Sequence, residues 1–160
     1  MKLLVIRMSS LGDVILATSF LESLPTGTIV DWVISKDFAF VLRGHPRIRN
    51  LIEFDKKTGI GGWFRLMKQL SQSDYDVKVD LHVTIRSLLA RIFFPGPWKS
   101  ISKQRLNFYG YLIFKNLWPD EFRPHPLWKR FASVAESISK SLWVNSRSLK
   151  IPALRSVVTI

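Results

Sequence analysis

Cysteine is absent from the 160-residue sequence, and histidine occurs only three times. The missing thiols exclude disulfide bonds, thiolate catalysis and metal sites that need cysteine ligands. Long apolar runs are also absent, because charged residues interrupt every stretch that approaches the ~18 apolar residues of a membrane-spanning helix. The interrupting residues are Arg7, Asp13, Glu22, Arg86 and Arg91. We therefore expect a cytoplasmic protein that does not span a membrane.

Acidic residues are scarce, with 12 Asp and Glu against 24 Lys and Arg, which gives a net charge of +12. The deficit is uneven, since residues 1–80 carry a net +2 and residues 81–160 carry a net +10. A surface of this charge suits a phosphorylated ligand, an anionic bilayer or nucleic acid. Charge alone leaves these partners open, and it also fits ordinary solvated helix faces.

Aliphatic runs alternate along the chain with segments of helical periodicity, as is typical of a parallel sheet covered by helices. We therefore expect a three-layer α/β domain over residues 1–145, followed by a connector. The strand-like runs are residues 2–8, 28–34, 50–54, 76–82, 98–102 and, after the connector, 156–160. The helix-like segments are residues 13–24, 37–42, 63–70, 85–93 and 126–142. An aromatic-rich segment, residues 106–117, remains unassigned.

Two of the helix-like segments have apolar residues at the spacing of one helical face. In the first, these residues are predicted to face the sheet: Trp63, Leu66, Met67 and Leu70. In the second, they form another apolar helical face: Ile85, Leu88, Leu89, Ile92 and Phe93.

Neither a metal site nor a dinucleotide site is indicated. His45 and His125 lie beside prolines without the partner spacing of metal ligands. Gly59–Gly62 lacks both the third glycine of a dinucleotide fingerprint and the Lys-Ser/Thr of a P-loop. We interpret this glycine-rich stretch as part of a flexible polar loop, residues 55–62.

The loop after the first strand-like run, Ser9-Ser10-Leu11-Gly12-Asp13, is the strongest candidate site. Ligands of open parallel sheets bind beyond the carboxyl ends of the strands, where helix N-termini offer free N–H groups. Gly12 permits a close backbone approach or a positive φ. Asp13 fits either a cap of the following helix, worth about 0.5–2 kcal/mol, or a catalytic carboxylate.

The opening residues 2–16, with a hydrophobic strand, Ser-Ser-Leu-Gly-Asp and an aliphatic helix, resemble the bacterial ADP-heptose:lipopolysaccharide heptosyltransferases, glycosyltransferase family 9. The resemblance continues in the family's order through most of the chain. The further similar segments are residues 30–33, 75–81, 86–91 and 125–136.

This resemblance implies the N-terminal half of a GT-B fold, in which a Rossmann-like domain binds the acceptor and a second domain binds most of the nucleotide sugar. Residues 146–160 would then be the connector and, from Ser156 to Ile160, the first strand of that donor domain. Asp13 would be the general base that deprotonates the acceptor hydroxyl as it attacks ADP-heptose with inversion. No separate cofactor or metal is implied.

The implied acceptor is the anionic inner core of lipopolysaccharide, met at the inner face of the inner membrane. The implied acceptor-binding residues are Ser9, Ser10, Gly12, Arg86 and Arg105. The sequence departs from the family at His82-Val83, where the family commonly has Gln before Gly, and we interpret His82 as a core or loop residue.

Two alternatives to a transferase remain. One is a non-catalytic module that binds anionic glycolipid. The other is a nucleic-acid-binding module, which the basic charge permits but which no recognisable nucleic-acid motif supports. Asp80, at the end of a strand-like run, is interpreted as structural.

Overall fold

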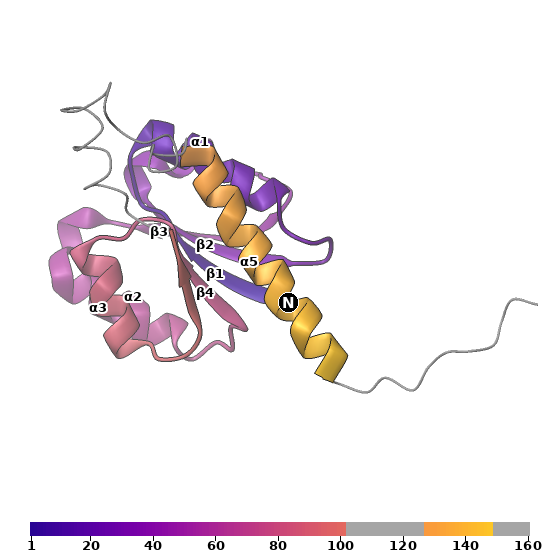
Figure 1. Cartoon of the computed structure of the whole chain (residues 1–160). Coiled ribbons are helices and arrows are strands. Elements are labelled where there is room, and N and C mark those ends of the chain that lie inside the picture. Colours follow the sequence, from indigo (N-terminus) through magenta and orange to yellow (C-terminus); the bar gives the residue numbers. More distant parts are fainter. Residues whose placement is uncertain (102–126, 149–160) are drawn as a thin grey trace, which may run out of the picture.

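The computed structural model describes residues 1–101 and 127–148 (Figure 1). Its five strands are β1 (Lys2–Ile6), β2 (Ile29–Ser35), β3 (Ile48–Phe54), β4 (Val77–Asp80) and β5 (Trp98–Ser100). Its α-helices are α1 (Leu11–Glu22), α2 (Gly59–Leu70), α3 (Ile85–Phe93) and α5 (Leu127–Ser148), and the short 3-10 helices are η1 (Lys36–Val41) and η2 (Lys56–Thr58).

The strands form one parallel sheet in the order β3-β2-β1-β4-β5. From β1 the chain builds outward through β2 to β3, and then crosses back to place β4 on the other side of β1. Ile6 of β1 lies beside Asp80 of β4 in this register. The topological switch point, where such sheets bind ligands, therefore lies between the carboxyl ends of β1 and β4.

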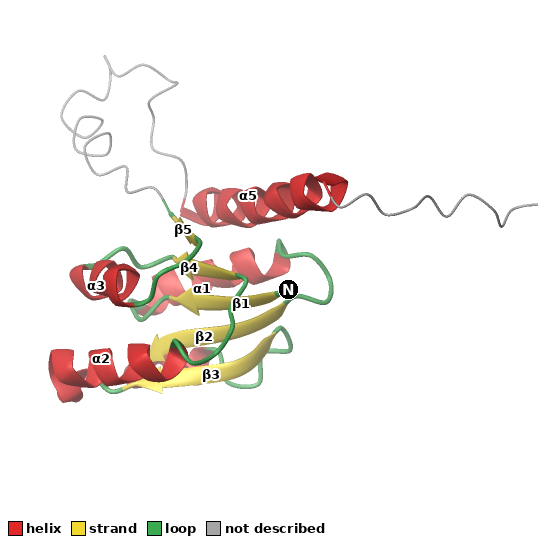
Figure 2. Cartoon of the chain, turned by 90° about the horizontal axis from the view of Figure 1, so that it is seen from below, coloured by secondary structure: helices red, strands yellow, loops and turns green. Residues whose placement is uncertain are grey.

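Helices cover both faces of the sheet, as the alternating sequence pattern predicts (Figures 1 and 2). On one face α1 and α5 pack over alternate strand residues, with Trp32, Phe20 and Phe131 at the centre of the core. On the other face α2 and α3 cover a second core that contains Leu4, Trp63 and other buried residues. Strands β1, β2 and β3 contribute side chains to both cores, which explains why β1 and most of β2 are apolar without alternation.

The glycine-rich stretch is helical, and the prediction of a flexible loop there is wrong. Gly59 to Gly62 form the first turn of α2. The helix forms because Trp63, Met67 and Leu70 are buried against the sheet, and such packing outweighs the low helix propensity of glycine. A side chain at Gly62 would overlap Thr58, with only 2.0 Å from its Cβ to the Thr58 Oγ1.

The apolar face predicted for residues 85–93 does not face the sheet. In α3 the buried positions are Ser87 and Ala90, whereas Ile85, Leu88 and Ile92 are exposed. The periodicity was correct, but it could not tell which side of this helix is covered. Leu16 of α1 is likewise exposed.

The helix predicted from Pro126 begins at Leu127 and continues to Ser148. It therefore runs past residue 145, and the domain boundary expected there stays a prediction. Arg105, residues 106–117 and the strand-like run 156–160 lie outside the described residues. Among the helices of the described ranges, none is long and apolar enough to cross a membrane.

Candidate functional site

Two neighbouring loops meet at the switch point of the sheet. One joins β1 to α1 and carries Ser9 and Ser10, and the other joins β4 to α3 and carries His82, Val83 and Thr84. Because β1 and β4 are paired, both loops and both helix N-termini open on the same edge of the sheet.

Asp13 lies in the first turn of α1, three residues after the N-cap residue Ser10. Its Oδ2 accepts the Ser10 backbone N–H at 3.4 Å and the Ser10 hydroxyl at 3.1 Å. The same oxygen forms an ion pair with Arg7. These three contacts all involve Oδ2, so Oδ1 accepts no hydrogen bond from the described residues. The Asp13 side chain is 37% exposed. The capping role is therefore present, and it leaves one oxygen open for chemistry.

Arg7, which the sequence analysis missed, holds this loop in place. It is almost completely buried, it pairs with Asp13, and it also donates to the backbone carbonyl of Leu81 after β4. Its guanidinium carbon lies 5.8 Å from the ring centroid of Phe131, so α5 covers it. Burial lowers the pKa of Arg7, and the Asp13 and Asp80 carboxylates oppose this shift. The sequence signal that could have identified Arg7 is its position directly after the aliphatic residues of β1, where a buried cation needs a partner.

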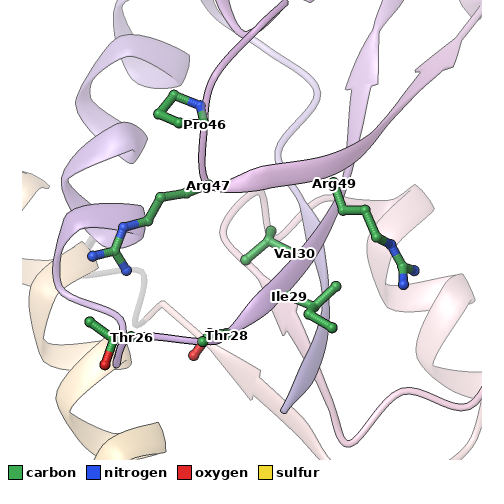
Figure 3. Close-up of a pocket in the computed structure, with 8 residues that line it drawn as sticks. Thr26, Thr28, Ile29, Val30, Pro46, Arg47 and Arg49 are labelled. Atoms are coloured by element: carbon green, nitrogen blue, oxygen red, sulfur yellow. The ribbon is translucent and has the colours of Figure 1, made fainter.

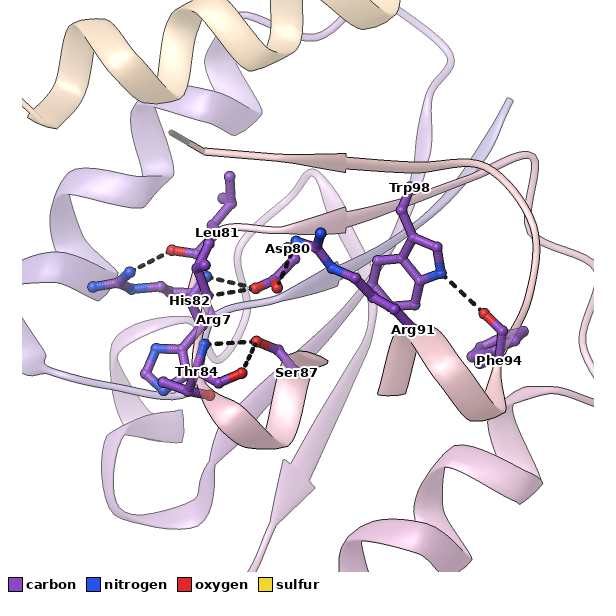
Figure 4. Close-up of polar contacts among 10 residues, drawn as sticks. Arg7, Asp80, Leu81, His82, Thr84, Ser87, Arg91, Phe94 and Trp98 are labelled. Atoms are coloured by element: carbon purple, nitrogen blue, oxygen red, sulfur yellow. Dashed lines mark hydrogen bonds and ion pairs between the residues drawn. The ribbon is translucent and has the colours of Figure 1, made fainter. Parts of the chain in front are cut away.

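Asp80 shapes the second loop (Figure 4). It is fully buried at the end of β4, and its Oδ1 accepts the backbone N–H groups of His82 at 2.9 Å and Val83 at 2.7 Å. Its Oδ2 accepts from Arg91 of α3 at 3.0 Å. All of these contacts are internal, which agrees with the structural interpretation of Asp80.

A pocket of about 740 Å³ opens beside this loop. Its lining residues come from the segment after β1, the end of β4 and the loop that follows it, the first turn of α2, and helix α3: Met8, Ile60, Asp80, His82, Val83, Thr84, Ile85, Arg86, Leu88 and Arg91. The carbonyl of Arg86 accepts the Trp63 indole N–H at 2.8 Å, which fixes the start of α3. Among the described residues none forms an ion pair with the Arg86 guanidinium. The pocket thus offers a cation between aliphatic walls.

The predicted site residues divide between the two loops. Ser10 and Asp13 are in contact, and half-buried Ser9 precedes them, whereas Arg86 lines the pocket of the neighbouring loop. Gly12 has no positive φ, so that part of its interpretation is wrong, but nothing lies within 4 Å of a Cβ added there. A close approach to its backbone therefore stays open.

A second pocket, of about 470 Å³, lies at the opposite edge of the sheet (Figure 3). Its two cations are engaged by the protein itself. Arg47 donates to the Leu24 carbonyl at 2.9 Å, and Arg49 pairs with the buried Asp31 at 2.9 Å. We therefore assign it no role in ligand binding. Within the described ranges no cluster of three or more potential metal ligands occurs.

The chain is similar in sequence to a curated heptosyltransferase and similar in fold to solved glycosyltransferase structures. The lipopolysaccharide core heptosyltransferase OpsX of Haemophilus influenzae is 29% identical over 140 residues, which are 85% of this chain and 40% of that protein. No protein-family model matches the chain. The chain thus spans well under two thirds of the length of this curated relative.

Solved structures share the fold. A glycosyl transferase family 9 protein of Veillonella parvula superposes with a TM-score of 0.63 at 24% identity, over 86% of this chain and 41% of that one. The E. coli heptosyltransferase WaaC with ADP superposes with a TM-score of 0.57 at 17% identity, over 98% of this chain and 50% of that one. The predicted fold, a Rossmann-like three-layer domain equivalent to half of a GT-B protein, is confirmed.

Proposed function

We propose that this chain, which resembles the N-terminal half of the family 9 heptosyltransferases, is the acceptor-binding half of a heptosyltransferase-like enzyme. The observation that carries the proposal is the open Oδ1 of Asp13 at the switch point of the sheet, on the loop beside the pocket that contains Arg86. A carboxylate and a cation at that edge suit a reaction in which an anionic sugar is deprotonated.

In the proposed reaction, Asp13 acts as general base. A hydroxyl of the acceptor gives its proton to Oδ1 while its oxygen bonds to the anomeric carbon of ADP-heptose. The bond from that carbon to the diphosphate breaks, ADP leaves with the electron pair, and the configuration inverts. Arg7 and Ser10 hold Oδ2, so they orient the carboxylate without occupying the reacting oxygen.

The proposed acceptor is the lipopolysaccharide inner core, and Arg86 is its anchor. A guanidinium pairs with phosphate or carboxylate through two parallel hydrogen bonds, which fixes orientation as well as position. Ser9 and the open backbone at Gly12 are proposed to contact the same sugar on the Asp13 side. ADP-heptose would be held mainly by a complementary donor domain that residues 146–160 lead into.

Transfer from ADP-heptose to heptose-free lipopolysaccharide tests the proposal, with this chain alone and with a separately expressed donor half of the OpsX relative. We expect Asp13→Asn to lower kcat by at least about 100-fold, because general-base catalysis typically contributes 10²–10⁴-fold. The matched control is Asp37→Asn, which removes an exposed carboxylate that pairs with Lys56 at 3.2 Å. An active Asp13→Asn variant would contradict the role of Asp13.

A non-catalytic glycolipid-binding module is the second candidate, because the Arg86 pocket is formed without Asp13. Binding of heptose-free core oligosaccharide, measured by calorimetry, separates the two. Binding that Arg86→Gln weakens, combined with no transfer in either arm, would favour the binding module. Transfer in the mixture would favour the enzyme.

A further inference from the structure

Helix α3 presents its aliphatic side chains to the outside of the domain. Ile85, Leu88 and Ile92 are 78%, 57% and 67% exposed, while Ser87 and Ala90 on the other side are buried. Their spacing of three and four residues places the three aliphatic side chains in one row. Ile60 of α2, 52% exposed, lines the same pocket as Ile85 and Leu88. We call these four residues the α3 aliphatic patch.

The charges on the two helices that carry the patch have one sign, and the one carboxylate in the adjoining pocket, that of Asp80, is paired with Arg91. Helices α2 and α3 contain four cations and no acidic residue: Arg65, Lys68, Arg86 and Arg91. Arg91 pairs with Asp80, but Arg65 and Lys68 are exposed on α2, which packs beside α3. An aliphatic row flanked by cations is the pattern of helices that lie in the headgroup region of anionic membranes.

The charges also decide between the possible occupants. A second copy of this chain, docked symmetrically, would bring the same cations against one another, and like charges across an interface oppose association. An anionic bilayer complements both the cations and the aliphatic side chains. We propose that the α3 aliphatic patch docks on the surface of an anionic bilayer, with Ile85, Leu88 and Ile92 inserted among the lipid headgroups.

The position of the pocket supports this orientation, and this step rests on the proposed function. Ile60, Ile85 and Leu88 form part of the pocket wall and part of the patch at the same time. A glycolipid whose anionic sugar reaches Arg86 therefore has its lipid end beside the patch. Docking through the patch would bring the pocket to the membrane surface, where such an acceptor is held.

Vesicle flotation of the full chain tests the docking. The probes are phosphatidylglycerol–phosphatidylcholine vesicles and pure phosphatidylcholine vesicles. We expect the combined variant Ile85→Ser, Leu88→Ser and Ile92→Ser to bind the anionic vesicles at least about tenfold more weakly, because each inserted methylene contributes to partition. The matched control is Phe40→Ser, which removes a 62% exposed aromatic side chain from η1 and should bind as the wild type does.

The charge contribution is tested with Arg65→Gln and Lys68→Gln. Each cation removed near an anionic surface should weaken binding about fivefold, and added salt should reduce this difference. Pure phosphatidylcholine vesicles should bind the wild type weakly and should not distinguish the charge variants from it.

Three outcomes of the variant and sedimentation measurements would overturn the docking surface. One is a combined variant that melts like the wild type and binds anionic vesicles equally well. Another is a wild type that sediments as a dimer in solution and becomes monomeric in the combined variant, which would assign the patch to a second copy. The third is equal loss of binding in Phe40→Ser.

Soluble heptose-free core oligosaccharide separates this inference from the proposed function. The single variant Ile92→Ser should bind the oligosaccharide as the wild type does and anionic vesicles more weakly, because Ile92 belongs to the patch but does not line the Arg86 pocket. A wild type that binds vesicles through the patch but binds no oligosaccharide would refute the proposed acceptor and leave the docking surface standing. A wild type that binds oligosaccharide but no anionic vesicle would refute the docking surface and leave the proposed acceptor standing.

Discussion

Helices α2 and α3 cover the same face of the sheet and have similar amphipathic sequences. However, α2 turns its apolar side toward the sheet, whereas α3 turns its apolar side toward the outside. Helix α2 buries its large residues, including Trp63 and Met67, whereas α3 buries Ser87 and Ala90 and exposes its aliphatic row. Periodicity therefore identifies a face of a helix without showing which face the protein covers.

The difference follows from what fills the space beneath each helix. The core that Ala90 of α3 joins also contains Phe94, the residue that ends α3, which packs edge-to-face with Trp98 at 6.4 Å and with Tyr75 at 6.2 Å between ring centroids. Lys78 of β4 is also buried there, with its ammonium 2.8 Å from the Pro95 carbonyl and 4.5 Å from the Phe94 ring centroid. Small residues on α3 suffice to close this layer, and its larger residues point outward.

The largest expected effect comes from removing the main contact of α2. Trp63 is fully buried, packs edge-to-face on Phe54 at 5.2 Å between centroids, and donates to the Arg86 carbonyl. We expect Trp63→Ala to lower the free energy of unfolding by about 3–5 kcal/mol, measured in urea. The matched change on α3, Leu88→Ala, should alter it by about 0.5 kcal/mol or less. Equal losses of unfolding free energy would show that Leu88 of α3 is as buried as Trp63 of α2, and that the two helices do not differ in which face they bury.

A smaller effect is expected from enlarging the buried side of α3. Ala90 is fully buried against the second core. A leucine there must displace its neighbours, so Ala90→Leu should cost about 1–3 kcal/mol of unfolding free energy. Urea unfolding measures the change, with Leu89→Ala on the half-buried side as a milder comparison. A neutral result would mean that the layer under α3 has room for a large side chain and that the helix could turn its aliphatic row inward.

The sequence predicted most of the fold because the relevant signals are local. Strand-like runs bounded by turns located the five strands that lie within residues 1–101, and the apolar spacing of α2 located its buried face. The sequence could not predict which face of α3 is buried, because Ser87 and Ala90 look like ordinary helix residues until Ala90 is known to share a core with Phe94. The order of the strands in the sheet also could not be predicted from local signals, because it depends on pairing between segments that are far apart in the sequence.

The candidate site was predicted in part for the same reason. Asp13 and Arg86 were found through short motifs that begin helices, which a resemblance can carry residue by residue. Arg7 was missed because its partners come from three distant segments, around Asp13, Leu81 and Phe131. No spacing rule connects such positions before the chain is folded.

The smallest expected effect concerns how the chain enters the two helices. A residue in the left-handed region stands at each entrance, and it is Gly59 with φ 64° at α2 but Val83 with φ 47° just before α3. A β-branched residue is strained in this region, by about 1–2 kcal/mol, whereas glycine is not. Val83→Gly should therefore raise the free energy of unfolding, and urea unfolding measures the change.

The net gain should be about 0.5 kcal/mol, because a new glycine also increases the entropy of the unfolded chain by a comparable but smaller amount. The mirror variant Gly59→Val should lose more stability than Val83→Gly gains, because the backbone of Gly59, at φ 64° and ψ −153°, is in a region that only glycine adopts readily. Val83 also packs against the first core and donates its N–H to Asp80. If Val83→Gly instead destabilises the protein, the apolar contacts of Val83 outweigh the backbone strain, and the start of α3 is held by side-chain packing where the start of α2 is held by glycine.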